Sequence, residues 1–151
     1  MKIDKPTYLP QYINWHGASN PESLSTDLSQ EIGQLLSQPL SQDQRASLAV
    51  SGGRTPVALF ERLSQSRLEW SKIDLTLVDE RWVEVSHVDS NEALVRKHLL
   101  QNNASQAAFI PIKNNAKNAK DGQPACEQAL SQAKQPFDVV VLGMGNDGHT
   151  A

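Results

Sequence analysis

The sequence has few of the features that mark several large classes of protein. Its single cysteine, Cys126, cannot form an internal disulfide, which favours a reducing compartment, and we expect a cytoplasmic protein. No stretch is long and apolar enough to cross a membrane, and the N-terminal residues lack the apolar core of a secretory signal. With a formal net charge of -3, the chain has no basic excess, so we expect no broad nucleic-acid surface.

The chain also lacks the ligand spacing of a metal site. Its 4 histidines and one cysteine do not recur at the intervals typical of metal ligands, so we expect neither a metal nor another cofactor. His16, His87 and His98 have no glycine-rich or strand-end surroundings, and we expect each to be structural or exposed. Only His149 follows a glycine-rich segment.

What the chain does have is an alternation of short apolar runs and amphipathic stretches. The predicted strands lie at 12–15, 46–50, 73–78, 109–112 and 137–142. The predicted helices run from about 20 to a stop at Pro39, from 55–56 through 63, from 89 to 100 and from about 124 to 134. The run at 137–142 is apolar throughout, which predicts a central parallel strand buried on both faces.

Strands that alternate with helices predict an α/β fold, a doubly wound and mostly parallel sheet with helices on both faces. Right-handed crossovers bring the carboxyl ends of the strands to one edge, where ligands bind in such sheets. Residues 1–151 show no internal repeat and no linker, so we expect one domain. Three polar segments follow strands, and we expect them to meet at this edge.

The first polar segment is Ser51-Gly52-Gly53-Arg54-Thr55, between a predicted strand and a predicted helix. Two glycines let the backbone approach an anion closely, and a helix N-terminus offers unpaired N–H groups. The hydroxyl groups and the guanidinium can add further donors. The segment fits phosphate binding and, equally well, a glycine turn before a capped helix.

The second segment contains Asp79 and Arg81 at the end of the strand predicted at 73–78. Its carboxylates can orient hydroxyl groups or a proton carrier, and Arg81 can bind an oxyanion in a bidentate manner. Taken alone, the segment fits a solvated corner of salt bridges better. Asn91, further along the chain, fits either a helix cap or a side chain that reaches the cleft.

The third segment, residues 143–150, is the most informative one. It begins with Gly143 and Gly145 and reaches His149, with Asp147 two residues before the histidine. Glycines directly after a buried strand indicate a loop whose backbone lines a site. An imidazole can act as base and then as acid near neutral pH, and Asp147 can hold its tautomer. We therefore expect His149 to be catalytic.

Together, the stretches SGGRTP, LVDERWV, DSNEAL and FDVVVLGMGNDGHTA resemble the 6-phosphogluconolactonase family, in order and in spacing, from about Ser19 onward. The resemblance implies a Rossmann-like α/β fold and hydrolysis of 6-phosphogluconolactone to 6-phosphogluconate in the oxidative pentose phosphate pathway. It implies phosphate contacts from Ser51, Gly52, Gly53 and Thr55, an Arg81 in the site and a general base at His149. Family members continue with further strands and helices, so we expect the chain to correspond to an N-terminal part.

Two other functions remain open at this point. The same fold serves aldose–ketose isomerases and amino-sugar deaminases, which also have a glycine-rich loop and an Asp-Gly-His motif. DERWV and GHTA favour the lactonase, since the deaminases typically show Asp-Glu-Tyr and a more apolar residue after the histidine. The third possibility is an inactive fragment that only binds sugar phosphates. The oligomeric state does not follow from the sequence.

Overall fold

The sheet is parallel throughout the part of the chain that the structure describes. The structure, a computed structural model, describes residues 4–42 and 44–150. Within these residues four strands pair in the order β3-β2-β1-β4. Their bounds are Ala46–Val50 for β1, Ile73–Leu77 for β2, Ala108–Ile110 for β3 and Val139–Val141 for β4. The predicted α/β class with a parallel sheet is confirmed.

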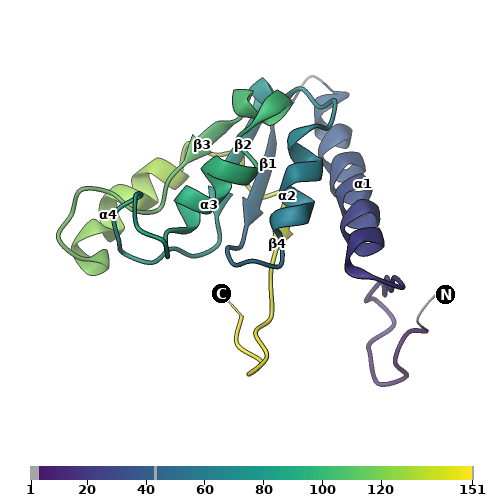
Figure 1. The fold of residues 1–151 in the computed structure, drawn as a ribbon. Helices are drawn as coiled ribbons and strands as arrows, with labels where there is room; N and C mark the ends of the chain where they lie inside the picture. Colours follow the sequence, from purple (N-terminus) through teal and green to yellow (C-terminus); the bar gives the residue numbers. More distant parts are fainter. Residues whose placement is uncertain (1–3, 43, 151) are drawn as a thin grey trace.

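Helix α1 precedes β1, and α2, α3 and α4 each lie in the crossover between two consecutive strands (Figure 1). Helix α1 spans Pro21–Leu40, α2 Val57–Ser64, α3 Asn91–His98 and α4 Ala119–Leu130, with short 3-10 helices at Trp70–Lys72 and Asn102–Gln106. In Figure 1, α1 and α2 lie side by side, and α4 lies at the far end of the sheet from α1. None of these helices, within the described residues, is both long and apolar enough to cross a membrane.

The core forms where the two inner strands meet α1 and α2. All five residues of β1 and all five of β2 are buried. Leu36 of α1 and Phe60 of α2 are fully buried against them. Continuous burial is expected for inner strands of a parallel sheet, because helices can cover both faces. This rigid centre holds the ends of β1 and β2 at fixed positions.

Hydrogen bonds near the amino ends of β1 and β4 fix where β4 begins. The carboxylate of Asp138 accepts from the backbone N–H of Ser47 at 2.8 Å, and the Asp138 N–H donates to the Ser47 hydroxyl at 3.1 Å. Lys134 forms an ion pair with the same carboxylate. These two hydrogen bonds join β1 to β4 and hold the two strands in register. The register determines which residues follow β4 at its carboxyl end.

The prediction for 137–142 is wrong in two respects. The strand is shorter, and β4 is an edge strand that pairs with β1 alone among the described residues. Val140 is 48% exposed and Leu142 is 61% exposed. An apolar run shows that a strand fits a buried position, but it does not determine the order of strands in the sheet.

Other predicted bounds also differ from the structure. Residues 12–15 begin in a turn and a bend and form no strand, and Tyr12 is 86% exposed. The third strand is 108–110, and α1 continues through Pro39 to Leu40. Helix α4 starts at Ala119 because Asn118 caps it, accepting from the N–H of Asp121 at 3.0 Å. Pro124, predicted to begin this helix, lies inside it.

Candidate active site

The three polar segments leave the sheet at the same level. Val50, at the end of β1, is in register with Leu77 of β2 and with Val141 of β4. Beyond the strands, the Ser51 N–H donates to the Val141 carbonyl at 3.1 Å and the Val78 N–H to the Val50 carbonyl at 3.0 Å. The expectation that these segments meet is therefore confirmed by the backbone.

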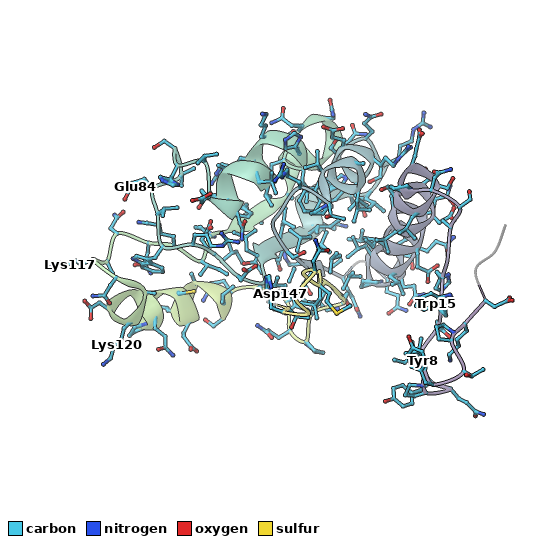
Figure 2. All side chains as sticks on the ribbon, turned by 60° about the horizontal axis from the view of Figure 1, so that its bottom comes forward. Tyr8, Trp15, Glu84, Lys117, Lys120 and Asp147 are labelled. Carbon is cyan, nitrogen blue, oxygen red and sulfur yellow. The ribbon has the colours of Figure 1, made fainter. Side chains whose placement is uncertain are left out.

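A cavity of about 370 Å³ opens at this edge. Figure 2 turns the molecule so that the edge comes forward, and Asp147 lies on the segment after β4, in front of the sheet. Tyr8 and Trp15 lie at the outer side, beside α1. Ten predicted site residues line the cavity: Ser51, Gly52, Gly53, Thr55, Asp79, Arg81, Asn91, Gly143, Gly145 and His149.

The glycine segment requires its glycines for two different reasons. Gly53 has φ +93°, a left-handed conformation that side chains disfavour. Gly52 lies directly under the side chain of Asn91, and a Cβ atom at Gly52 would overlap the Asn91 carboxamide. Asn91 is buried, and its Nδ2 donates to the Asp79 carbonyl at 3.1 Å. Asn91 therefore reaches the cleft, and Ser90 is the cap of α3.

The N-terminus of α2 follows this segment and has no side-chain cap. Its N-cap residue is Pro56, whose side chain offers no acceptor. The other described α-helices are each capped by a side chain that accepts a hydrogen bond, from Asn20, Ser90 or Asn118. A helix end with free N–H groups and a positive dipole is suited to an anion.

The charged turn after β2 divides its side chains between two environments. Asp79 and Arg81 line the cavity. Glu80 instead accepts hydrogen bonds from the N–H groups of Asn91 and Glu92, each at 2.8 Å. The sequence analysis did not single out Glu80, because no local pattern shows that a strand-end carboxylate will meet a helix start eleven residues later.

His149 and Asp147 form a hydrogen-bonded pair in the loop after β4. The distance from Nδ1 of His149 to Oδ1 of Asp147 is 2.5 Å, and both side chains are largely exposed. The loop folds back on itself, since the Gly145 N–H donates to the His149 carbonyl at 2.8 Å. A Cβ atom at Gly145 would lie 2.6 Å from the imidazole, so only glycine fits beneath the pair. Gly148 has φ +84°.

This pairing has an electrostatic consequence for Asp147. The hydrogen bond from His149 lowers the pKa of the Asp147 carboxyl below its ordinary value of 3.8. If the carboxylate accepts from Nδ1–H, the lone pair of the neutral imidazole is at Nε2. Such a histidine can take up a proton while the carboxylate stabilises the resulting cation.

We expect the replacement of His149 by alanine to raise the pKa of Asp147 toward 3.8. A carboxylate whose folded pKa is depressed stabilises the folded loop above its unfolded pKa, and this contribution is lost as the pH falls through the folded pKa. The loop pairing should therefore persist at neutral pH and disappear only as the pH falls through the depressed pKa of Asp147, which lies below 3.8. Carboxyl ¹³C shifts across a pH titration measure this. An identical Asp147 titration in both proteins would contradict the pairing.

Two predicted residues do not line the cavity. Arg54 is exposed beside it, and Asp147 contacts it only through His149. Among the described lining residues, His149 is the one histidine. His98, the last residue of α3, instead forms a hydrogen bond with Glu61 of α2 at 2.9 Å. This agrees with a structural role for His98.

The sequence analysis also missed the apolar wall of the cavity. Leu24 and Leu28 of α1 line it, together with Met144. The two leucines belong to the same helical repeat as the buried Leu36, so periodicity alone does not distinguish them from core residues. Their partial exposure, 43% for Leu24 and 39% for Leu28, follows from the position of α1 at the sheet edge.

The lining groups determine which chemistry the cavity can support. Arg81 is the one lysine or arginine among the described lining residues, so an anion would depend on backbone N–H groups as well. Within residues 4–42 and 44–150, no group of three or more His, Cys, Asp or Glu side chains is arranged to hold a metal ion. The arrangement combines a glycine loop suited to an anion with a histidine suited to proton transfer.

Comparison with known proteins shows the family to which the chain belongs. The model of the family described as glucosamine-6-phosphate isomerases/6-phosphogluconolactonase matches residues 19–151. The chain belongs to this family. The match includes all the strands and all the predicted site residues.

Proteins named 6-phosphogluconolactonase are among the similar members of this family. The protein from Pseudomonas aeruginosa is 46% identical over 124 residues, which cover 82% of this chain and 52% of that protein. The protein from Neisseria meningitidis serogroup A is 45% identical over 139 residues, 91% of this chain and 60% of that protein. The chain thus spans between half and two thirds of the length of these relatives.

Solved structures of the family share the fold. A 6-phosphogluconolactonase from Shewanella baltica superposes with a TM-score of 0.86 at 48% identity, covering 88% of this chain and 57% of that one. A monomeric glucosamine-6-phosphate deaminase superposes with a TM-score of 0.71 at 17% identity, which shows the common fold alone. The Rossmann-like α/β architecture expected from the sequence is confirmed.

Proposed function

We propose that the chain contributes the substrate loop and the general base of a 6-phosphogluconolactonase. The reaction is hydrolysis of 6-phospho-D-glucono-1,5-lactone to 6-phosphogluconate, in the cytoplasm and without a metal or other cofactor. The observation that supports this most is one cavity lined by both the glycine segment after β1 and His149 after β4. The similarity to proteins named 6-phosphogluconolactonase favours the same reaction.

The phosphate of the substrate would bind at the glycine segment. Ser51 and Thr55 supply hydroxyl groups, Gly52 and Gly53 allow close approach of the backbone, and the uncapped start of α2 supplies N–H groups. Binding of this remote group would orient the lactone ring, so that its binding energy contributes to the reaction at C1.

His149 would activate the attacking water. Its Nε2 takes a proton from the water as the oxygen bonds to C1, while Asp147 at Nδ1 stabilises the imidazolium. The tetrahedral intermediate carries an oxyanion, for which Arg81 or the N–H groups of the loop at Gly143 and Gly145 are the available donors. When the C1–O5 bond breaks, His149 returns the proton to O5, which becomes the hydroxyl group of 6-phosphogluconate.

A direct assay tests this proposal. Formation of 6-phosphogluconate from the lactone is followed with spontaneous hydrolysis subtracted, for the chain alone and for the chain fused to the C-terminal part of the Pseudomonas aeruginosa relative that it does not match. We expect hydrolysis by the fusion, unaffected by a chelator. Release of ammonia from glucosamine 6-phosphate by the fusion, without lactone hydrolysis, would identify a deaminase instead.

Ligand binding by the chain itself provides a second prediction. We expect 6-phosphogluconate to raise the Tm, because a ligand that binds only the folded state stabilises it by RT ln(1 + [L]/Kd), about 2.7 kcal/mol at a hundredfold excess over Kd. Gluconate, which lacks the phosphate, is the matched control and should raise it less. Equal shifts with both compounds would contradict a phosphate site at the glycine segment.

A further inference from the structure

Four hydrogen-bond donors surround the carboxylate of Glu80, which follows the end of β2. Oε1 accepts from the N–H of Asn91 at 2.8 Å and from the N–H of Arg81 at 2.7 Å. Oε2 accepts from the N–H of Glu92 at 2.8 Å and from the Ser90 hydroxyl at 3.4 Å. The carboxylate thus binds the first N–H groups of α3, at the positive end of the helix dipole.

Capping alone does not explain this arrangement, because α3 already has a cap. The Ser90 side chain accepts from the Ala93 N–H at 3.1 Å. What Glu80 adds is a link between the end of β2 and the start of α3, at the residue whose side chain covers the glycine segment. Asn91 is 6% exposed and lies directly over Gly52. A shift of Asn91 would therefore change the space available to the backbone of Gly52.

We infer that Glu80 is a positioning residue for the anion-binding loop, an inference that rests on the proposed function. Its carboxylate holds the N-terminus of α3 so that Asn91 stays over Gly52 and donates to the Asp79 carbonyl. The bond from the Arg81 N–H fixes the turn from which the Arg81 side chain enters the cavity. Glu80 touches no substrate and acts through Asn91.

The test begins with Glu80→Gln in the chain as it stands, with inorganic phosphate as the probe. The amide keeps the shape of the side chain but replaces one acceptor oxygen by an NH₂ group that faces an N–H donor. We expect the Kd for phosphate to rise about tenfold, the effect of losing one hydrogen bond to a charged group. Glu84→Gln is the matched control, since the Glu84 side chain is 84% exposed and forms one ion pair among the described residues, with Lys113 at 3.4 Å.

A second control separates positioning from stability. Asn118→Ala removes the cap of α4, which does not line the cavity, and should lower Tm with less than a twofold change in Kd. In the Asn91→Ala background, Glu80→Gln should cause no further loss of affinity, because residues that act through one another are not additive. A full tenfold loss in that background would overturn the inference.

A ligand-free measurement keeps this inference distinct from the proposed function. In Glu80→Gln, amide hydrogen exchange should accelerate at Asn91, Glu92 and Gly52, and it should be unchanged in Glu84→Gln. If the unaltered chain does not bind phosphate, the phosphate site is wrong, but this exchange pattern still decides the role of Glu80. Unchanged exchange at Gly52 in Glu80→Gln would overturn the positioning role even where phosphate binds.

Discussion

Replacing His149 by alanine should lower kcat for lactone hydrolysis by about 10²–10⁴-fold, the usual effect of losing a general acid–base group. The loop geometry gives the reason. Asp147 occupies Nδ1 at 2.5 Å, which leaves Nε2 as the nitrogen that can take the proton of the attacking water. KM should change little, because the proposed phosphate site is a different part of the cavity wall, the segment after β1.

The pH dependence should change together with the rate. In the unaltered enzyme kcat/KM should fall on acidification, because a protonated imidazole cannot accept a proton from water. The alanine variant should lose this decrease. The measurement requires the fusion that is active in the lactone assay, with spontaneous hydrolysis subtracted at each pH.

His98→Ala is the matched control for this experiment. His98 bonds to Glu61 at 2.9 Å and does not line the cavity, so its removal should leave kcat unchanged. A His149→Ala variant with near-normal kcat would exclude His149 as the base. A large effect of both variants would point to loss of folding, which the Tm values of the two proteins would reveal.

The sequence predicted the parts of the fold that depend on local burial and on glycine. Strand β1 was predicted residue for residue, because the buried run at 46–50 ends at Ser51 and two glycines. The convergence of three segments also followed, since parallel strands place their carboxyl ends at one edge. Nine of the predicted site residues line the cavity for this reason, and the tenth, Asn91, lines it from the start of α3.

What the sequence did not predict depends on contacts between distant segments. Within the part of the chain that the structure describes, β4 pairs with β1 alone and lies at the edge, which no run of valines can reveal. The direction of the Glu80 side chain follows from the position of α3, eleven residues later. The exposure of Leu24 and Leu28 follows from the location of α1 at the rim of the cavity.

Gly52→Ala should abolish most of the affinity for phosphate and lower the stability of the chain. The new methyl group would occupy the place of the Asn91 carboxamide, so either Asn91 or the loop must move. Asn91 is buried, and its amide donates to the Asp79 carbonyl, so neither shift is free of cost. Overpacking of this kind costs about 1–3 kcal/mol.

Substitution of two other glycines provides the controls. Gly33→Ala measures the effect of a methyl group that meets no neighbour, and Gly53→Ala measures backbone strain without a collision. Gly33 lies within α1 with no neighbour within 4 Å of an added Cβ, and Gly33→Ala should stabilise the chain by about 0.5–1 kcal/mol through helix propensity. Gly53→Ala meets no neighbour but places a side chain at φ +93°, which costs about 1–3 kcal/mol of strain. For the three variants, urea unfolding measures the free energy of unfolding, and phosphate titration measures the Kd.

The three variants should differ in affinity more clearly than in stability. If Asn91 and Gly52 form one unit, Gly52→Ala should weaken phosphate binding by at least about tenfold, while Gly33→Ala leaves it unchanged. The decisive variant combines the two substitutions. Asn91→Ala removes the three atoms that lie nearest to the new methyl group, so Gly52→Ala should cost less further stability in this background. An equal loss of stability in both backgrounds would mean that the methyl group disturbs the loop without meeting Asn91.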